Sequence, residues 1–212
     1  MANGVVRLTE VMDRLRSPGG CPWDAEQTHQ SLVRHAIEET YEFADAVESG
    51  SRAEMRDELG DVLMQVVFHA RIAQEHPDQP FDLDDVANTC ADKLVERHPH
   101  VFGDVVVNNS ADVRANWDQI KAQTQGRESV MDGVPAALPA LARAQKIMSR
   151  ASRSGLEVRA EAGVGIGQQL LALVARAQAE GVDAESELRD ATRAYEAAAR
   201  EAESAATEHS SK

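Results

Sequence analysis

The chain has 212 residues, of which 42% are hydrophobic, and its formal net charge is −14. A chain of this length and apolar content can bury an ordinary core in one or two small domains, which excludes disorder throughout. The acidic balance argues against nucleic-acid binding through a broad basic surface, because that mode needs many lysines and arginines to neutralise phosphates.

The predicted secondary structure is helical throughout, because apolar residues recur at spacings of three and four and alternating β-branched runs are scarce. We expect a first helix over residues 8–16, a turn at residues 17–20 and an irregular segment with the sequence Cys-Pro-Trp-Asp at residues 21–24. A second helix is expected over residues 29–48. Its apolar face consists of Val33, Ile37, Tyr41, Ala44 and Val47.

A third helix is predicted to follow the second after a very short connection. Gly50 is placed to end the second helix, and Ser51 forms a capping-box pattern with Glu54. With so short a connection, the two helices should pack antiparallel. The apolar stripe of the third helix consists of Leu59, Val62, Leu63, Val66, Val67, Ala70 and Ala73.

A fourth helix is predicted over about residues 83–95, ending before His98-Pro99-His100. We expect a loop to run from there to Asn109, after which Ser110 caps a short helix.

The expected domain organisation has two helical parts. Residues 1–123 form the first domain, residues 124–139 a linker, residues 140–203 a second helical domain and residues 204–212 a flexible tail. Three alternating glycines at residues 163–167 interrupt the second part. They do not predict a phosphate loop, since no strand precedes them and no Gly-Lys-Ser/Thr sequence follows.

The densest group of acidic residues lies on the second and third helices, as EETYE at residues 38–42 and ELGD at residues 58–61. Its members form two pairs that are each three residues apart and therefore on one side of a helix, Glu39 with Glu42 and Glu58 with Asp61. Between antiparallel helices the pairs can converge, and converging carboxylates need a cation. All-oxygen ligation suits Mg²⁺ or Mn²⁺. Gly60 would permit a close approach beside them.

The spacing of these acidic residues also bears on other interpretations. In an acidic protein they can simply be solvated side chains on helix surfaces, and spacing alone leaves this interpretation open. A ferritin-like di-iron site requires Glu-x-x-His on two helices, and neither Glu39 nor Glu58 has His three residues later. An EF-hand that begins at Asp82 lacks the required Gly and Glu at its sixth and twelfth positions.

Two features of composition concern the cellular compartment. Cys21 and Cys90 are too few for a disulfide scaffold and lack the Cys or His spacing of a zinc site. No early segment is typical of a signal peptide, and no run approaches the roughly 20 apolar residues that span a bilayer. We therefore expect a soluble protein of the reducing cytoplasm with no membrane partner.

The acidic motifs and their flanking segments resemble a known family. EETYE followed by ELGD is similar to the EExxE and ExxD signature of MazG-type nucleoside triphosphate pyrophosphohydrolases. MDRLRSPGGCPWDAEQTH upstream, and KLVERHPHVFGD and NWDQIKAQ downstream, resemble other segments of the MazG domain, so the resemblance covers about residues 8–123. It implies an all-α helical bundle that forms a homodimer or a larger homo-oligomer.

The resemblance also implies an activity and a metal. The activity is hydrolysis of (deoxy)nucleoside triphosphates between the α- and β-phosphates, to nucleoside monophosphate and pyrophosphate, as a house-cleaning step in the nucleotide pool. Glu39, Glu42, Glu58 and Asp61 are the implied ligands of Mg²⁺, with Mn²⁺ as a substitute. Glu38 is the candidate that orients or deprotonates the attacking water, unless it pairs with Arg34 one turn earlier.

Substrate-binding residues are expected downstream of the acidic motifs. Lys93 and Arg97 are four residues apart and can present cationic groups to phosphate on one side of a helix, although an ordinary surface pair has the same spacing. By the resemblance, Trp117 packs near the nucleotide and Lys121 contacts phosphate, while burial of Trp117 in the core is the alternative. Trp23 either lines a base pocket by stacking or closes the ends of the helices.

The second half departs from the family pattern. Some chains of the family carry two MazG domains in tandem, and SVMDGVPAALPALARAQKIMSR resembles the connector between them. Gly165 and Gln168 then stand where the first copy has Glu58 and Asp61. We therefore predict a degenerate, catalytically inactive second MazG-like domain. The alternative function for the whole chain is a non-catalytic helical module that binds metal or a partner.

Overall fold

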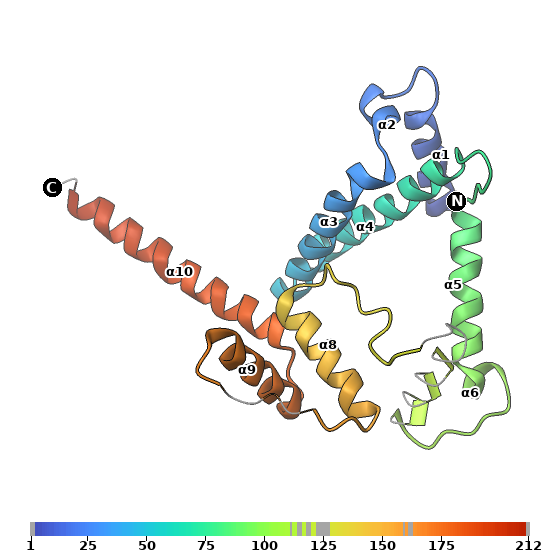
Figure 1. Cartoon of the computed structure of the whole chain (residues 1–212). Helices are drawn as coiled ribbons and strands as arrows, with labels where there is room; N and C mark the ends of the chain where they lie inside the picture. Colours follow the sequence, from blue (N-terminus) through green and yellow to red (C-terminus); the bar gives the residue numbers. More distant parts are fainter. Residues whose placement is uncertain are drawn as a thin grey trace. The chain divides into compact units, whose positions relative to one another are not determined.

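The computed structural model describes residues 3–110, 112, 113, 116, 117, 120, 121, 128–158, 160 and 163–210. The chain divides into two compact units, residues 1–117 and 118–212. Every regular element in the described part is an α-helix (Figure 1), which confirms the all-α prediction. None of the helices formed by the described residues is long and apolar enough to cross a bilayer.

The first unit is built around a helical hairpin. Its described helices are α1 (Gly4–Arg16), α2 (Pro22–Glu26), α3 (His29–Ser49), α4 (Arg52–Ala73), α5 (Leu83–Arg97) and α6 (Pro99–Phe102). Helices α3 and α4 pack side by side along their length, and α4 also packs against α1 and α5 (Figure 1). The predicted hairpin is present, and it brings the two acidic motifs together.

Local sequence explains where the hairpin helices begin and end. Thr28 and Ser31 exchange hydrogen bonds between their hydroxyl groups and backbone N–H groups, which completes a capping box at the start of α3. Gly50 has φ 75°, the left-handed conformation that commonly ends a helix. The hydroxyl of Ser51 then accepts a hydrogen bond from the backbone N–H of Glu54 and begins α4. Gly50 ends α3 as predicted and Ser51 caps α4, but the predicted capping box is not completed, because the backbone N–H of Ser51 donates to the hydroxyl of Ser49 at 3.3 Å.

The core of the first unit lies where α1, α3 and α4 meet. Met12, Leu32, Val67 and Phe68 form the buried cluster. Leu8, Met64, Ile72 and Leu83 pack against it. The prediction was right for the second half of α4, where Val67, Ala70 and Ala73 are buried.

The apolar face predicted for α3 exists, but it is not the buried one. Val33, Ile37, Tyr41 and Val47 are between 41% and 51% exposed, whereas Leu32 and Ala46 are buried. Three residues of the stripe predicted for α4 are exposed as well, namely Leu59, Leu63 and Val66. Apolar residues occupy more than one side of each helix, so periodicity did not identify the buried side.

Several helix boundaries differ from the prediction. Helix α1 begins at Gly4, where the side chain of Asn3 caps it. The segment expected to be irregular forms α2, with Pro22 at its first position, where proline is favoured because its missing N–H is not needed. Pro99 begins α6 in the same way, inside the expected loop. Asn109, rather than Ser110, accepts the capping hydrogen bond from the backbone N–H of Asp112, at 3.0 Å.

The second unit contains α8 (Ala140–Arg153), α9 (Ile166–Glu180) and α10 (Ala184–Ser210), which pack against one another. The side-chain amide of Gln145 on α8 donates to the carbonyl of Val182 at 2.7 Å and accepts from the backbone N–H of Ala184 at 2.9 Å, which fixes the start of α10. Helix α10 continues through residues 204–210 of the expected tail. Residues 124–127 of the expected linker and 211–212 of the tail lie outside the described residues.

Candidate metal centre

Three of the four predicted carboxylate ligands meet between α3 and α4. Oxygen atoms of Glu39, Glu58 and Asp61 all lie within 4.8 Å of one another. Glu39 comes from the middle of α3, and the other two come from the first half of α4. Glu42 lies one turn after Glu39 and is not part of this close group, although its charge acts on both Glu39 and Glu58.

The close group of carboxylates is electrostatically unfavourable without a cation. Partial burial, followed by the charges of Asp61 and three further carboxylates, raises the pKa of Glu39. The pKa of Glu58 is also raised, first by partial burial and then by Glu42, Asp61 and other acidic neighbours. The Oε2 atom of Glu58 is buried and has no hydrogen-bond partner among the residues that the structure describes. A buried acceptor of this kind requires a donor or a cation.

The donor set indicates which cation fits. The group found among the described residues contains carboxylates alone, without the His that a ferritin-like di-iron site would contribute. Oxygen ligands of this charge suit a hard divalent cation such as Mg²⁺ or Mn²⁺. Gly60 lies between the two α4 ligands, and a Cβ atom added there would meet no atom within 4 Å. The prediction that Gly60 permits a close approach is therefore wrong for contacts with the described residues of this chain, because none of them lies close to this added Cβ atom.

Glu38, the predicted base, lies beside the group rather than in it. Its carboxylate Oε2 is 3.7 Å from the Nδ1 atom of His35, and its side chain is 65% exposed. Arg34, the alternative partner considered for Glu38, instead donates from Nε to Nε2 of His35 at 3.3 Å. The neighbour of the Glu38 carboxylate is therefore His35 and not Arg34, which was expected there.

Arg97 and Trp117, two of the predicted substrate-binding residues, lie against each other. The guanidinium of Arg97 lies 5.3 Å from the centre of the Trp117 ring, a cation–π distance, and the Nε atom of Arg97 is buried without a hydrogen-bond partner in the described part of the chain. The ring of His98 meets Trp117 edge-on at 5.0 Å. Trp117 is half-buried and lies outside the core cluster.

The other two predicted substrate-binding residues are Lys93 and Lys121. Lys93 lies one turn before Arg97 on α5 and is exposed. Lys121 belongs to the second unit. The roles of both lysines stay predictions.

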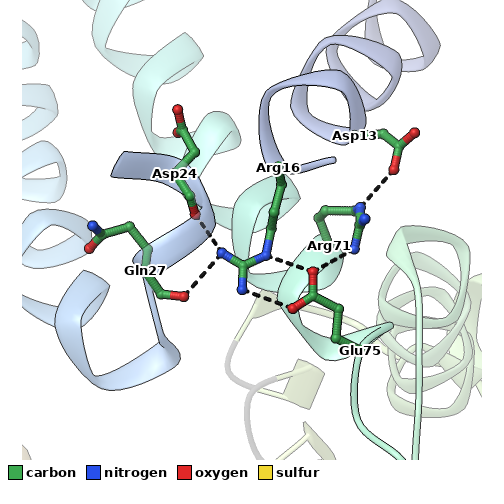
Figure 2. A network of polar contacts seen from close by, with 6 residues as sticks. All are labelled: Asp13, Arg16, Asp24, Gln27, Arg71 and Glu75. Carbon is green, nitrogen blue, oxygen red and sulfur yellow. Dashed lines mark hydrogen bonds and ion pairs between the residues drawn. The ribbon is translucent and has the colours of Figure 1, made fainter. Parts of the chain in front are cut away.

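Arg16 is the principal residue of this region that sequence reasoning missed. Its side chain is only 7% exposed and forms a two-point ion pair with Glu75, with 2.8 Å between Nε and Oε1 and 2.9 Å between Nη2 and Oε2 (Figure 2). Its Nη1 atom donates to the backbone carbonyls of Asp24 at 2.5 Å and Gln27 at 3.0 Å. Because 59 residues separate Arg16 from Glu75, no local pattern could have predicted the pair.

Arg71 completes the same network from α4. It donates to Oε1 of Glu75 at 2.9 Å and to Oδ1 of Asp13 at 2.7 Å (Figure 2). The two arginines lower the pKa of Glu75, first through the side-chain hydrogen bond from Arg16. The network therefore ties α1, the segment after it and the end of α4 together.

Comparisons with known proteins agree with the motifs of the first unit. The family model of the MazG nucleotide pyrophosphohydrolase domain matches residues 27–102, which include the three close carboxylates. An uncharacterized 26.1 kDa protein of Streptomyces cacaoi, from the blaB 3′ region, is 54% identical over 198 residues, which are 92% of this chain and 81% of that protein.

Two relatives have names that state an activity. The nucleoside triphosphate pyrophosphohydrolase of Escherichia coli is 45% identical over 159 residues, which are 73% of this chain and 60% of that enzyme. The nucleoside triphosphate pyrophosphohydrolase/pyrophosphatase MazG of Thermotoga maritima is 38% identical over an alignment, gaps included, of 212 positions, which covers 89% of this chain and 81% of that enzyme. The match thus spans less than two thirds of the Escherichia coli relative.

Proposed function

The chain belongs to the MazG family of nucleotide pyrophosphohydrolases, and we propose that it hydrolyses nucleoside triphosphates between the α- and β-phosphates to nucleoside monophosphate and pyrophosphate. The observation that carries the proposal is the convergence of Glu39, Glu58 and Asp61 inside the matched region. The names of the Escherichia coli and Thermotoga maritima relatives support the same activity. We assign the protein a house-cleaning role on cytoplasmic nucleotides.

Glu39, Glu58 and Asp61 would hold Mg²⁺, with Glu42 as the fourth carboxylate one turn away. The buried, unpartnered Oε2 of Glu58 supports this assignment, because a cation would satisfy it. When bound, Mg²⁺ supplies positive charge against the triphosphate oxygens, and Mn²⁺ can take its place. Crowding and partial burial of the carboxylates raise the pKa values of Glu39 and Glu58. The same crowding is the reason why the group needs a cation.

The remaining proposed roles belong to side chains around the acidic group. Glu38 would accept a proton from the attacking water, with His35 at 3.7 Å holding its carboxylate. Arg97 would donate to a phosphate oxygen, which would satisfy its buried Nε, and Lys93 one turn earlier would add a second positive charge. Trp117 would pack near the nucleotide while it holds the guanidinium of Arg97, and Lys121 would contact phosphate.

We propose that the protein forms a homodimer through the exposed apolar sides of α3 and α4. On α3 this surface contains Val33, Ile37 and Tyr41, and on α4 it contains Leu59, Leu63 and Val66. Spacings of three and four residues place each set on one side of its helix. Apolar residues that gather on one surface commonly mark a protein interface.

The second unit is proposed to be a degenerate MazG-like domain. Gly165 and Gln168, at the positions of the missing ligands, instead begin α9, where the backbone N–H of Gly165 donates to Oε1 of Gln168 at 3.4 Å. Removal of residues 155–212 should then leave pyrophosphate release intact. Loss of kcat in a truncated protein that still folds and dimerises would contradict a merely supporting role.

The competing function is a helical module that binds metal or a partner without catalysis. Product analysis separates the two. The purified chain is incubated with a panel of nucleoside triphosphates in Mg²⁺, in Mn²⁺ and in EDTA, and the phosphate products are separated by ion chromatography. Equal amounts of nucleoside monophosphate and pyrophosphate, formed with metal only, are expected. Orthophosphate with nucleoside diphosphate, or no product from any triphosphate, would contradict the proposed activity.

A further inference from the structure

The segment of residues 22–28 carries an aromatic side chain beside the hairpin. It contains α2, leads directly into α3 and is called the Trp23 segment below. The ring of Trp23 meets His35 edge-on at 6.2 Å and Phe68 edge-on at 6.5 Å between ring centres. Trp23 nevertheless keeps 52% of its surface exposed. A half-exposed indole held by two neighbouring rings is suited to stacking against a planar ligand.

The two residues that seat Trp23 lie on the helices of the acidic group. His35 is four residues before Glu39 on α3, which is about 6 Å along the helix axis. Phe68 is seven residues after Asp61 on α4, or about 10 Å along its axis. Trp23 therefore lies at one end of the acidic group, where the base of a nucleotide held there by its phosphates would be within reach.

Arg16 attaches this segment to the rest of the unit. Its Nη1 atom donates to the carbonyls of Asp24, inside α2, and Gln27, directly after α2, while Nε and Nη2 donate to the two carboxylate oxygens of Glu75 (Figure 2). The guanidinium also lies 6.0 Å from the centre of the Phe68 ring, the same ring that Trp23 contacts. One side chain thus fixes the backbone on the C-terminal side of Trp23 and packs near the ring beneath it.

A lysine cannot reproduce this set of contacts. The planar guanidinium presents five N–H groups in a fixed fork, and four hydrogen bonds use all three of its nitrogen atoms at once. An ammonium is a single point with three donors on a flexible stem. It would keep the positive charge beside Glu75 but would not hold Glu75, Asp24 and Gln27 together.

We propose that Arg16 is a positioning residue for substrate binding, which fixes the Trp23 segment so that the indole of Trp23 stacks on the base of the bound nucleoside triphosphate. The inference rests on the proposed function, and it assigns Arg16 no contact with the substrate. Stacking on an aromatic face tolerates any base. The expected consequence is therefore general affinity for nucleotides over base-free phosphates, with little discrimination among bases.

Steady-state kinetics on the full chain separates positioning from general damage. The two variants are Arg16→Lys and Trp23→Leu, and the probes are ATP as substrate and inorganic tripolyphosphate as a competitive inhibitor, both with Mg²⁺. Each variant should raise KM for ATP about tenfold, the size of one lost base–aromatic stack. The inhibition constant of tripolyphosphate, which has no base, should not change. A matched control is Arg14→Lys, because Arg14 lies on the same helix and contacts the carbonyl of Pro18 at the edge of hydrogen-bond distance, 3.5 Å.

A binding measurement tests the role of Arg16 without depending on catalysis. The chain has two tryptophans, so the fluorescence of Trp23 is obtained as the difference between wild type and Trp23→Leu. This fluorescence should be quenched by α,β-methylene-ATP and not by tripolyphosphate, and Arg16→Lys should remove the quenching.

The outcomes distinguish two different failures. If the wild-type chain releases no pyrophosphate from any triphosphate, the proposed function fails, and the quenching experiment alone decides about Arg16. If the wild-type chain is active but Arg16→Lys and Trp23→Leu leave KM unchanged, the inference is overturned. An equal rise in KM and in the tripolyphosphate inhibition constant would also overturn it, because a base-specific contact cannot move both.

Discussion

At the scale of single residues, Glu58 illustrates how a site can be recognised by an unsatisfied atom. Its neighbours in the close group are carboxylates, its pKa is raised, and its Oε2 is buried without a partner. The spacing of EETYE and ELGD predicted which residues share a side, and the structure brings three of the four within ligand distance of one another. Spacing did not predict that Glu42 lies outside the close group, because this depends on side-chain direction.

A pair of histidines offers a test at the same scale. The Nδ1 atoms of His29 and His69 are 2.8 Å apart, and their ring planes lie within 5° of parallel. One Nδ1 must donate and the other accept, so the contact survives with one proton between them and is lost when both rings are charged. Partial burial, and after it the neighbouring His29, lowers the pKa of His69.

The lowered pKa of His69 predicts the direction of a pH effect. In the window just below the ordinary value of 6.5, the unfolded state binds more protons at this residue than the folded state. The stability associated with neutral His69 is therefore present above that value and is lost as the pH falls through the lower folded pKa. We expect His69→Asn to flatten the fall in unfolding free energy below about pH 6.5, measured by urea denaturation at a series of pH values. An unchanged slope would contradict the assignment.

At the scale of elements, the hairpin was the most predictable part of the fold. Long periodic segments, a glycine that ends one helix and a serine that caps the next indicated α3 and α4 closely. Helices α2 and α6 were missed because five and four residues contain too little periodicity to show a helix. The Arg16–Glu75 pair was beyond prediction, since it joins elements far apart in the sequence.

Two glycines of the hairpin should respond oppositely to alanine. Gly50 has φ 75°, so Gly50→Ala forces a side chain into the left-handed region and should cost about 1 kcal/mol or more. Gly60 lies inside α4 with open space around its Cβ position, so Gly60→Ala should gain about 1 kcal/mol of helix propensity. Chemical denaturation of the two variants measures both. Destabilisation by Gly60→Ala would show that space around residue 60 is needed.

At the scale of the whole molecule, the apolar sides of α3 and α4 raise the question of assembly. Leu63 is 37% exposed among apolar neighbours on the surface proposed for dimerisation. Leu63→Glu should convert the homodimer to monomer, because a charge on an apolar interface loses its water without gaining a partner. Size-exclusion chromatography with light scattering measures the mass. Val106→Glu is the control, since Val106 lies in a loop and is already 85% exposed. A monomeric wild type, or a dimer that survives Leu63→Glu, would rule out this surface.

The two units also differ in how far their sequences identify a family. The first unit carries motifs that identify a family, and the matched residues 27–102 lie within it. The second unit is rich in alanine and arginine, and such helices align with almost any helical sequence, so its descent from a MazG domain stays a prediction. In the alignment behind that prediction, Gly165 and Gln168 stand for Glu58 and Asp61, and both lie at the start of α9.

Pyrophosphate release as a function of Mg²⁺ concentration shows whether the carboxylates between α3 and α4 hold the cation needed for triphosphate cleavage. The proteins compared are wild type, Glu58→Gln, Asp61→Asn and the control Asp57→Asn, whose side chain is 66% exposed and pairs with Arg56. We predict that both ligand variants lose about a hundredfold or more in rate, since even residues that only support metal ligands cost up to about that factor. Asp57→Asn should match wild type. Release that is unaffected by Glu58→Gln and Asp61→Asn would contradict the account.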